Sequence, residues 1–232
     1  MHLKRLNTPK RWNLSKKKTT FVARPTPGPY TKEMSLPLIV ILRDHLKVLT
    51  TKQQAKVLAN SKNLLVNNKA VSDLNYAIGL FDTISLPTIE KYYRLVLDYK
   101  GGLKLITIDK KESNVKLLRV DNKKRLKKGV IQFNLSGGRN LLSKDNFSIG
   151  DSLLFDLSKN VVIKKLPIKI GSKVLVIKGR HAGETPMLSG FKEFENITKD
   201  RAILKNKDST YQTMKDYIFV LGEGKEEIKI NE

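Results

Sequence analysis

The sequence predicts an α+β protein that is rich in strands and carries a basic, extended N-terminal arm. Apolar residues at 38, 39, 42, 46 and 49 follow a spacing near 3.6 residues, which is typical of a helix. From residue 64 onward, short apolar runs alternate with Gly, Asn or Pro, which favours strands joined by tight turns. The first acidic residue is Glu33, and the residues before it include nine Lys or Arg.

The composition of the whole chain limits what it can bind. The 232 residues carry a formal net charge of +23, which favours a polyanionic partner, either nucleic acid or an anionic membrane. The chain has no Cys, which excludes disulfides, thiol catalysis and Cys-based zinc sites and fits a reducing compartment, so we expect a cytoplasmic location. No apolar run approaches the ~18 residues of a membrane span, so we expect no membrane partner.

Residues 1–35 form the predicted arm. Like charges repel and Pro prevents long helices, so we expect this segment not to pack against itself. It could lie in a groove of RNA, where Lys and Arg neutralise phosphates and Trp12 or Tyr30 stacks on a base or a sugar. The alternatives are a disordered basic tail and a leader outside the fold.

Residues 36–86 predict two short helices and a hairpin. Pro37 suits the first turn of an amphipathic helix over 38–49. A more polar helix is expected to begin at Thr51. Asn tolerates positive φ, so the pair Asn67-Asn68 between two apolar runs indicates a tight hairpin. A turn and a strand follow over 76–86.

Residues 87–167 predict a β-rich central domain. Strands at 92–97 and 103–108 flank a Gly101-Gly102 turn, a short helix is expected at Asp109, and further strands at 115–120, 130–135, 152–157 and 161–166. Residues 122–129 hold five basic side chains, and we interpret them as a phosphate-contacting loop between two strands. The alternative is a solvated loop.

Residues 168–222 predict a small barrel, and residues 223–232 a frayed, mildly acidic tail. A strand over 173–177 precedes a Gly-rich turn around Gly179 and Gly183. Later strands are expected at 187–191, 201–205 and 216–221. The first strand and its turn resemble a KOW motif, in which glycines let the backbone approach RNA within an SH3-like barrel. Pro186 stands where that motif often has another Gly.

Residues of the first half resemble a known family. The two helices and the hairpin, ending in Gly79-x-x-Asp82-x-Ile84, resemble the S4-type RNA-binding module. His2-Leu3-Lys4-Arg5-Leu6, Pro9-Lys10-x-Trp12 and Arg24-Pro25-x-Pro27-Gly28-Pro29 are similar to the start of the archaeal and eukaryotic small-subunit ribosomal proteins of the S4e family. The short length resembles an archaeal-type form. Asn67-Asn68, Ala77, Tyr30 and Ala70-Val71 depart from the residues that are usual in that family.

The resemblance implies a structural constituent of the small ribosomal subunit whose partners are rRNA and neighbouring ribosomal proteins. The alternative is an RNA-binding assembly or transcription factor that leaves again. We expect no enzyme, cofactor, metal or small-molecule substrate. The three His residues lack metal-ligand spacing, and there is no P-loop or Gly-x-Ser-x-Gly elbow. Gly137-Gly138-Arg139-Asn140-Leu141 lacks the catalytic Asp of a pseudouridine synthase.

The candidate RNA-binding residues are the basic and aromatic side chains of these segments. In the arm they are Lys4, Arg5, Lys10, Arg11, Trp12, Lys16, Lys17, Lys18, Arg24 and Tyr30. Beyond the arm they are Arg43, Lys47, Lys52, Lys69, Lys123, Lys124, Arg125, Lys178 and Arg180.

Overall fold

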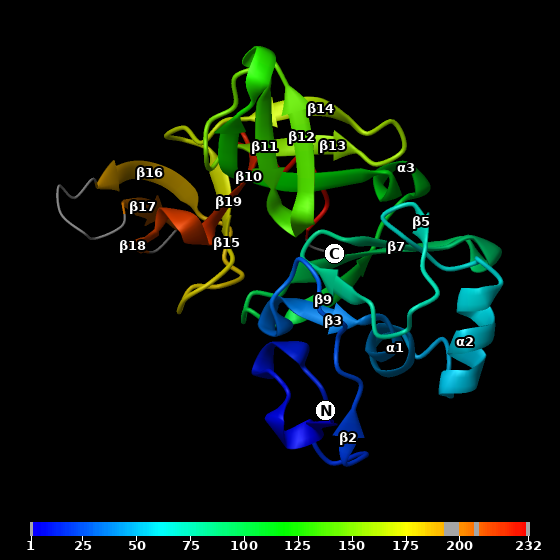
Figure 1. The fold of residues 1–232 in the computed structure, drawn as a ribbon. Helices are drawn as coiled ribbons and strands as arrows, with labels where there is room; N and C mark the ends of the chain where they lie inside the picture. The colour runs from blue at the N-terminus through cyan, green and yellow to red at the C-terminus, as the bar shows by residue number, and fades with distance from the viewer. Residues whose placement is uncertain (1, 193–199, 207–208, 231–232) are drawn as a thin grey trace.

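The computed structural model describes residues 2–192, 200–206 and 209–230 of the chain. Within these residues, strands dominate and helices are few and short (Figure 1). Three five-stranded sheets run in the orders β5-β4-β7-β8-β9, β12-β11-β10-β13-β14 and β18-β17-β16-β15-β19. Two pairs of short strands, β1-β2 and β3-β6, complete the sheet structure. The prediction of a mixed helix–strand fold that is rich in strands is confirmed.

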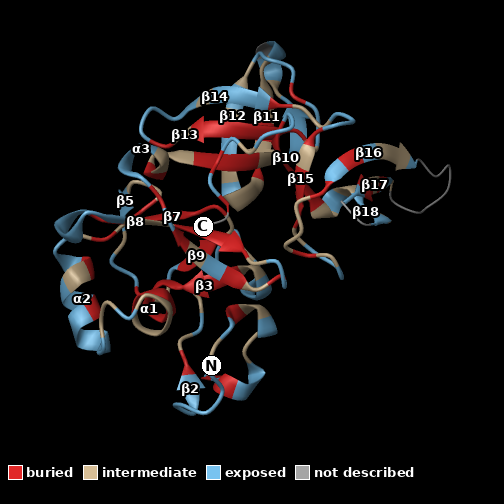
Figure 2. Ribbon diagram, turned by 180° about the vertical axis from the view of Figure 1, so that it is seen from behind, coloured by how far each residue is buried: buried red, intermediate tan, exposed pale blue. Residues whose placement is uncertain are grey.

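The N-terminal arm folds, which corrects the prediction of an extended segment. Its strands β1 (Leu3–Lys4) and β2 (Phe21–Val22) pair antiparallel, and 3₁₀ turns cover 5–7, 10–12 and 32–34. Trp12 is completely buried, and its indole N–H donates to the Lys32 carbonyl at 3.1 Å. The arm therefore buries apolar residues, and Leu3, Trp12 and Val22 extend the main core into the lower part of the molecule (Figure 2). The sequence argument weighed charge repulsion and missed this apolar anchor.

The first helix is present but is not amphipathic. After β3 (Ser35–Pro37), α1 (Leu38–Val40) continues into a π-helical turn over 41–45. Residues 36–42 are all buried, so this helix has no solvent-facing side there. Strand β6 (Ala77–Gly79) pairs with β3, which covers the helix entry. A helix that is apolar on all sides belongs in a core.

The second helix and the hairpin are confirmed. Helix α2 (Lys52–Asn60) is capped by Thr51, whose side chain accepts from Gln54 N while Gln54 reaches back to the Thr51 N–H. This reciprocal capping box satisfies two free backbone donors at the helix start. Strands β4 (Leu65–Val66) and β5 (Lys69–Ala70) enclose Asn67 and Asn68, both with positive φ.

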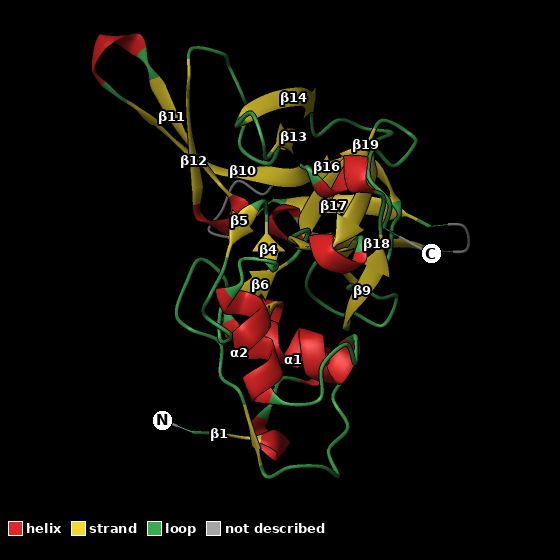
Figure 3. Ribbon diagram, turned by 90° about the vertical axis from the view of Figure 1, so that its right-hand side faces the viewer, coloured by secondary structure: helices red, strands yellow, loops and turns green. Residues whose placement is uncertain are grey.

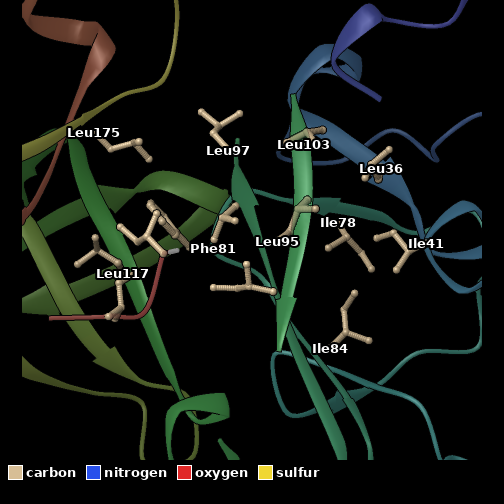
Figure 4. Packing of buried hydrophobic residues seen from close by; sticks show 14 of the residues in the cluster. Leu36, Ile41, Ile78, Phe81, Ile84, Leu95, Leu97, Leu103, Leu117 and Leu175 are labelled. Atoms are coloured by element: carbon tan, nitrogen blue, oxygen red, sulfur yellow. The ribbon is translucent and has the colours of Figure 1, made fainter. Parts of the chain in front are cut away.

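The first large sheet joins both sides of the predicted boundary at 86/87. Strand β7 (Thr83–Leu86) pairs with β8 (Lys91–Leu97), which pairs with β9 (Leu103–Thr107). Figure 4 shows buried side chains on both sides of these strands, with Leu36, Ile41 and Ile78 on one side. Phe81, Leu117 and Leu175 lie on the other side. One core therefore links the module to the later sheets.

The second large sheet follows α3 (Lys110–Ser113), the helix expected at Asp109. Its strands are β10 (Val115–Arg125), β11 (Ile131–Leu135), β12 (Arg139–Ser143), β13 (Ser152–Asp156) and β14 (Val161–Leu166). Strand β12 was not predicted, because its only apolar residues are Leu141 and Leu142. Residues 122–125 belong to β10, which corrects their prediction as part of a loop, and the turn comes at 127–129.

The third large sheet contains the KOW-like strand β15 (Lys173–Val176). The others are β16 (Met187–Lys192), β17 (Arg201–Lys205), β18 (Thr210–Met214) and β19 (Ile218–Gly222). Strand β18 was missed. The prediction of a frayed tail is wrong through residue 230, since Ile228 and Ile230 are buried and the Lys229 carbonyl accepts from Arg94. Residues 231–232 lie outside the described part of the chain.

Candidate nucleic-acid interface

The predicted RNA-binding side chains divide into an outward and an inward group. Those that are exposed are Lys4, Lys10, Lys16, Lys17, Lys18, Arg24, Lys47, Lys52, Lys69, Lys123, Lys124, Arg125, Lys178 and Arg180. Those that are buried or half-buried are Arg5, Arg11, Trp12, Tyr30 and Arg43. Almost all the outward side chains are Lys, whereas the inward group contains no Lys.

Arg5 and Trp12 hold the arm together, which corrects their assignment to RNA. The buried Arg5 guanidinium donates to the carbonyls of Thr19 and Ser15 at 2.9 and 2.8 Å, closing the loop that bears Lys16–Lys18. Trp12 has no exposed surface on which a base could stack. Arginine's planar fork can satisfy several carbonyls at once, which suits it to this internal role. Charge and spacing alone do not separate such an arginine from one that faces solvent.

Arg11 also serves the fold, because its guanidinium donates to the Ile177 carbonyl at 2.9 Å. This bond ties the arm to the residue that follows β15. Arg43 pairs with Asp44 at 2.9 Å and keeps part of its side chain exposed. Both side chains are half-buried, and Arg11 also lines a surface hollow, so each keeps a position from which RNA could be reached.

Tyr30 joins a buried ionic cluster instead of a stacking surface. Its hydroxyl donates to Asp82 at 3.0 Å, and its ring lies so close to Gly79 that any side chain there would collide. Burial, followed by the nearby Asp82 carboxylate, raises the pKa of Tyr30 well above its ordinary value. Tyr30 therefore remains a neutral hydrogen-bond donor inside the protein.

Asp82 is the centre of this cluster, which joins three parts of the chain. Its carboxylate accepts from Tyr30 of the arm, from Asn67 at 2.8 Å and from the Gly79 N–H at 2.7 Å. Lys116 of β10 completes the cluster with an ion pair to Asp82, and both side chains are buried. A buried ion pair offsets its desolvation only when the remaining polar atoms are also bonded, as they are here. The cluster fixes the arm and the second large sheet to the module.

Some of the candidate basic side chains gather at three places. The first is a hollow of about 470 Å³ between the arm and the module, which brings Arg24, Arg43 and Lys52 together. Phe21 and His2 also line it, and neither was among the predicted contacts. Phe21 lies three residues before Arg24 in the sequence, but the stacking role was predicted for Trp12 and Tyr30 instead.

The second place is a smaller hollow of about 320 Å³. Lys10 from the arm and Arg180 from the KOW-like turn line it together with Lys100, which sequence reasoning had left out. Asp98 also lines this hollow, so the hollow carries both positive and negative side chains. The cations here come from three segments that are far apart in the sequence.

The Gly-rich turn beside this hollow packs against protein. Gly183 has φ +96°, and a Cβ there would collide with the Asp98 carbonyl at 1.9 Å. The prediction that a sharp turn requires Gly183 is confirmed. The turn lies directly on the β8–β9 hairpin of the same chain. At this position the glycine therefore lets two backbone segments of the protein approach each other, and it does not face RNA.

The third place is the end of the β10–β11 hairpin, which bears Lys123, Lys124 and Arg125. We call residues 122–129 the basic hairpin tip. Figure 3 shows this hairpin extending away from the rest of the molecule. The remaining exposed candidates lie outside these three places, and they are Lys4, Lys16, Lys17, Lys18, Lys47, Lys69 and Lys178. The Lys178 ammonium lies 6.0 Å from the centre of the Tyr217 ring.

The described residues also bear on the requirements of a metal site and of a membrane span. No group of three or more His, Asp or Glu is gathered there in a way that could hold a metal ion. His45 is half-buried, and the loss of solvent around its imidazole lowers its pKa below the ordinary value. The described part of the chain also contains no helix that is both long and apolar enough to cross a bilayer.

Comparison with known proteins agrees with these observations. The profile of Ribosomal family S4e matches residues 89–162, and that of the RS4NT (NUC023) domain matches residues 1–33. The small ribosomal subunit protein eS4 of Methanothermobacter thermautotrophicus is 33% identical, over 99% of this chain and 95% of the relative. The chain belongs to the S4e family of ribosomal proteins. The eS4 protein of Methanocaldococcus jannaschii is 34% identical, over 99% of this chain and 97% of the relative.

A solved S4e structure has a similar fold. The crystal structure of the 30S ribosomal protein S4e from Thermoplasma acidophilum aligns with a TM-score of 0.70 and 25% identity. The alignment covers 82% of this chain and 96% of that one. The family recognised from the N-terminal motifs is therefore confirmed, and the RS4NT match at 1–33 nearly coincides with the predicted arm.

Proposed function

We propose that this S4e protein stabilises folded rRNA by placing rows of cations on a rigid scaffold. As a member of the family, the chain is a structural constituent of the small ribosomal subunit. The observation that carries the proposal is the division of the candidate side chains: most of the exposed ones are Lys, whereas Arg5, Arg11 and Trp12 serve the fold. The proposed location is cytoplasmic and ribosome-bound, and the proposed role is structural and not enzymatic.

The mechanism is phosphate neutralisation on a preformed surface. A protein that makes 6–10 phosphate contacts loses about 10³–10⁵ in affinity between 50 and 200 mM salt, because counterions compete. A folded arm has already lost most of its conformational freedom, so binding costs less ordering than it would for a disordered tail. In this proposal the S4-like residues 36–86 dock on folded RNA, and a KOW/SH3-like barrel formed by 168–222 covers an edge.

The test compares two sets of five charge-removing substitutions in the full chain. Lys4, Lys10, Lys16, Lys17 and Lys18 are changed to Gln in the arm variant. Lys91, Lys111, Lys144, Lys159 and Lys225 are changed to Gln in the control, and these are exposed as well. We expect the arm variant to leave small subunits at a lower salt concentration than the control in sedimentation. Equal retention of the two variants would contradict the proposal.

The alternative is an RNA-binding factor that acts in assembly or transcription and then leaves. The anchored arm argues against it. Hydrogen bonds from Tyr30 to Asp82 and from Arg11 to the Ile177 carbonyl hold the arm on the body of the protein, which gives a preformed surface for lasting binding. Sedimentation separates the two possibilities, since a structural constituent stays at one copy per mature subunit. A chain found only on immature particles would favour the alternative.

A further inference from the structure

Phe21 is an exposed aromatic side chain that the fold of the arm does not need. It lies in β2 with 52% of its surface exposed, while its neighbour Val22 is buried in the main core. The His2 ring leans on it, with centroids 5.5 Å apart and planes tilted by 55°. A single exposed apolar side chain is common on a protein surface, but this ring also lines a hollow that is lined by cations. The arm therefore presents a flat apolar ring at Phe21, whereas the stacking role had been predicted for Trp12.

The surroundings of Phe21 show what kind of partner would fit. The hollow beside it has a partly apolar lining that includes Val22 and Ile39, both buried. Arg24, Arg43 and Lys52 line it as well, and none of the side chains lining it is a carboxylate. Its volume of about 470 Å³ is in the range of about 300–1,000 Å³ that is usual for small-ligand sites.

These features match one unstacked nucleotide better than they match a peptide. A nucleobase offers a flat face to an aromatic ring, and its flanking phosphates need cations on either side. Arginine suits both tasks, because its planar guanidinium stacks on rings and binds phosphate with two hydrogen bonds. Asp44, which does not line the hollow, pairs with Arg43 at 2.9 Å and so restricts the position of its guanidinium.

We propose that this hollow binds a single flipped-out nucleotide of RNA, with the base on Phe21 and the phosphates near Arg24, Arg43 and Lys52. This proposal rests on the proposed rRNA-binding function and gives it a specific site. The arm and the module must both be in place to form it, since His2, Phe21 and Arg24 come from the arm and Arg43 and Lys52 from the module.

The first experiment measures affinity for a fluorescein-labelled single-stranded uridine 12-mer by anisotropy. Phe21→Ala removes the stacking ring. Leu6→Ala is the matched control, because Leu6 is 75% exposed in the same arm and does not line the hollow. Stacking contributes about 1–3 kcal/mol per base, so we expect Phe21→Ala to weaken binding about tenfold. Leu6→Ala should change it less than twofold, and Phe21→Trp should retain binding.

The second experiment keeps the proposal falsifiable if Phe21→Ala disturbs the arm. Native small subunits are cross-linked with ultraviolet light, and the peptide that carries Phe21 is analysed by mass spectrometry. A nucleotide adduct on Phe21 or His2 supports the site. A cross-link to a protein in place of RNA, or unchanged affinity for Phe21→Ala beside normal subunit association, overturns it and leaves the proposed function intact. A chain that does not associate with small subunits at all would contradict the proposed function itself.

Discussion

The N-terminal arm and the basic hairpin tip have similar composition but opposite relations to the rest of the protein. Both are rich in Lys and Arg. The arm is fixed by the buried Trp12, by Arg5 and by the bond from Tyr30 to Asp82. Residues 122–125 of the tip are all exposed, and the hairpin carries them away from the molecule (Figure 3).

The difference teaches that charge counts do not show how cations are presented. The arm's cations are positioned by apolar and hydrogen-bonded anchors, which make no RNA contact in the proposed interface. The tip's cations lie at the end of a three-stranded extension of the second large sheet, where β10 pairs only with β11 and residues 122–125 are exposed. Such an extension opens more easily than a packed segment. Substitutions that distinguish anchors from cations can therefore test the comparison.

The largest expected effect comes from Trp12→Ala. It removes no charge but empties the part of the main core that lies in the arm, and truncating a buried aromatic residue costs about 3–5 kcal/mol. We expect a lower urea midpoint, faster proteolysis within residues 2–35 and weaker RNA binding. The matched change at the tip is Leu126→Ala, which should cost less than about 1 kcal/mol at a half-buried site. Equal losses from the two variants would refute the contrast.

Tyr30→Phe should have the next largest effect. It removes only the hydroxyl that donates to Asp82 and accepts from Lys116, both of which are buried. Hydrogen bonds to charged groups contribute about 1.5–3 kcal/mol, so we expect a loss in that range in urea unfolding. Tyr99→Phe is the control, because Tyr99 is exposed and should lose almost nothing. A Tyr30→Phe protein as stable as the parent would mean that the cluster does not hold the arm.

Removal of cations should change binding more than stability. Lys16, Lys17 and Lys18 to Ala in the arm, or Lys123, Lys124 and Arg125 to Ala at the tip, should each change unfolding by at most about 0.5 kcal/mol. Each lost phosphate contact lowers the slope of log K against log salt by about one. We expect the arm variant to lose more affinity than the tip variant, measured by anisotropy with rRNA fragments. An unaltered slope for either variant would place its side chains in solvent.

Much of the fold was predictable because local chemistry decides it. Thr51 with Gln54 specifies a helix start, and Asn67-Asn68 specifies a tight turn, whatever lies around them. The buried roles of Arg5, Trp12 and Ile228 were not predictable in this way. Each depends on contacts with residues far along the chain, as Lys229 next to Ile228 shows by bonding to Arg94 through its carbonyl. The same limit applies to the site, since Lys100 and Arg180 meet only in the folded protein.

The smallest expected effect is a pH dependence of the arm's attachment through His45. Burial lowers the pKa of His45 below its ordinary 6.5, against the opposing influences of Asp44 and the Trp12 backbone. The unfolded chain takes up a proton near pH 6.5 and the folded chain only at lower pH, so stability falls as the pH drops below 6.5. We expect the urea midpoint of the parent to decrease between pH 7.5 and 5.5 by more than that of His45→Asn. The tip has no His, so the proteolysis rate of the tip should stay constant over the same range while that of the arm rises. Identical pH profiles for the parent and His45→Asn would show that acidification acts elsewhere.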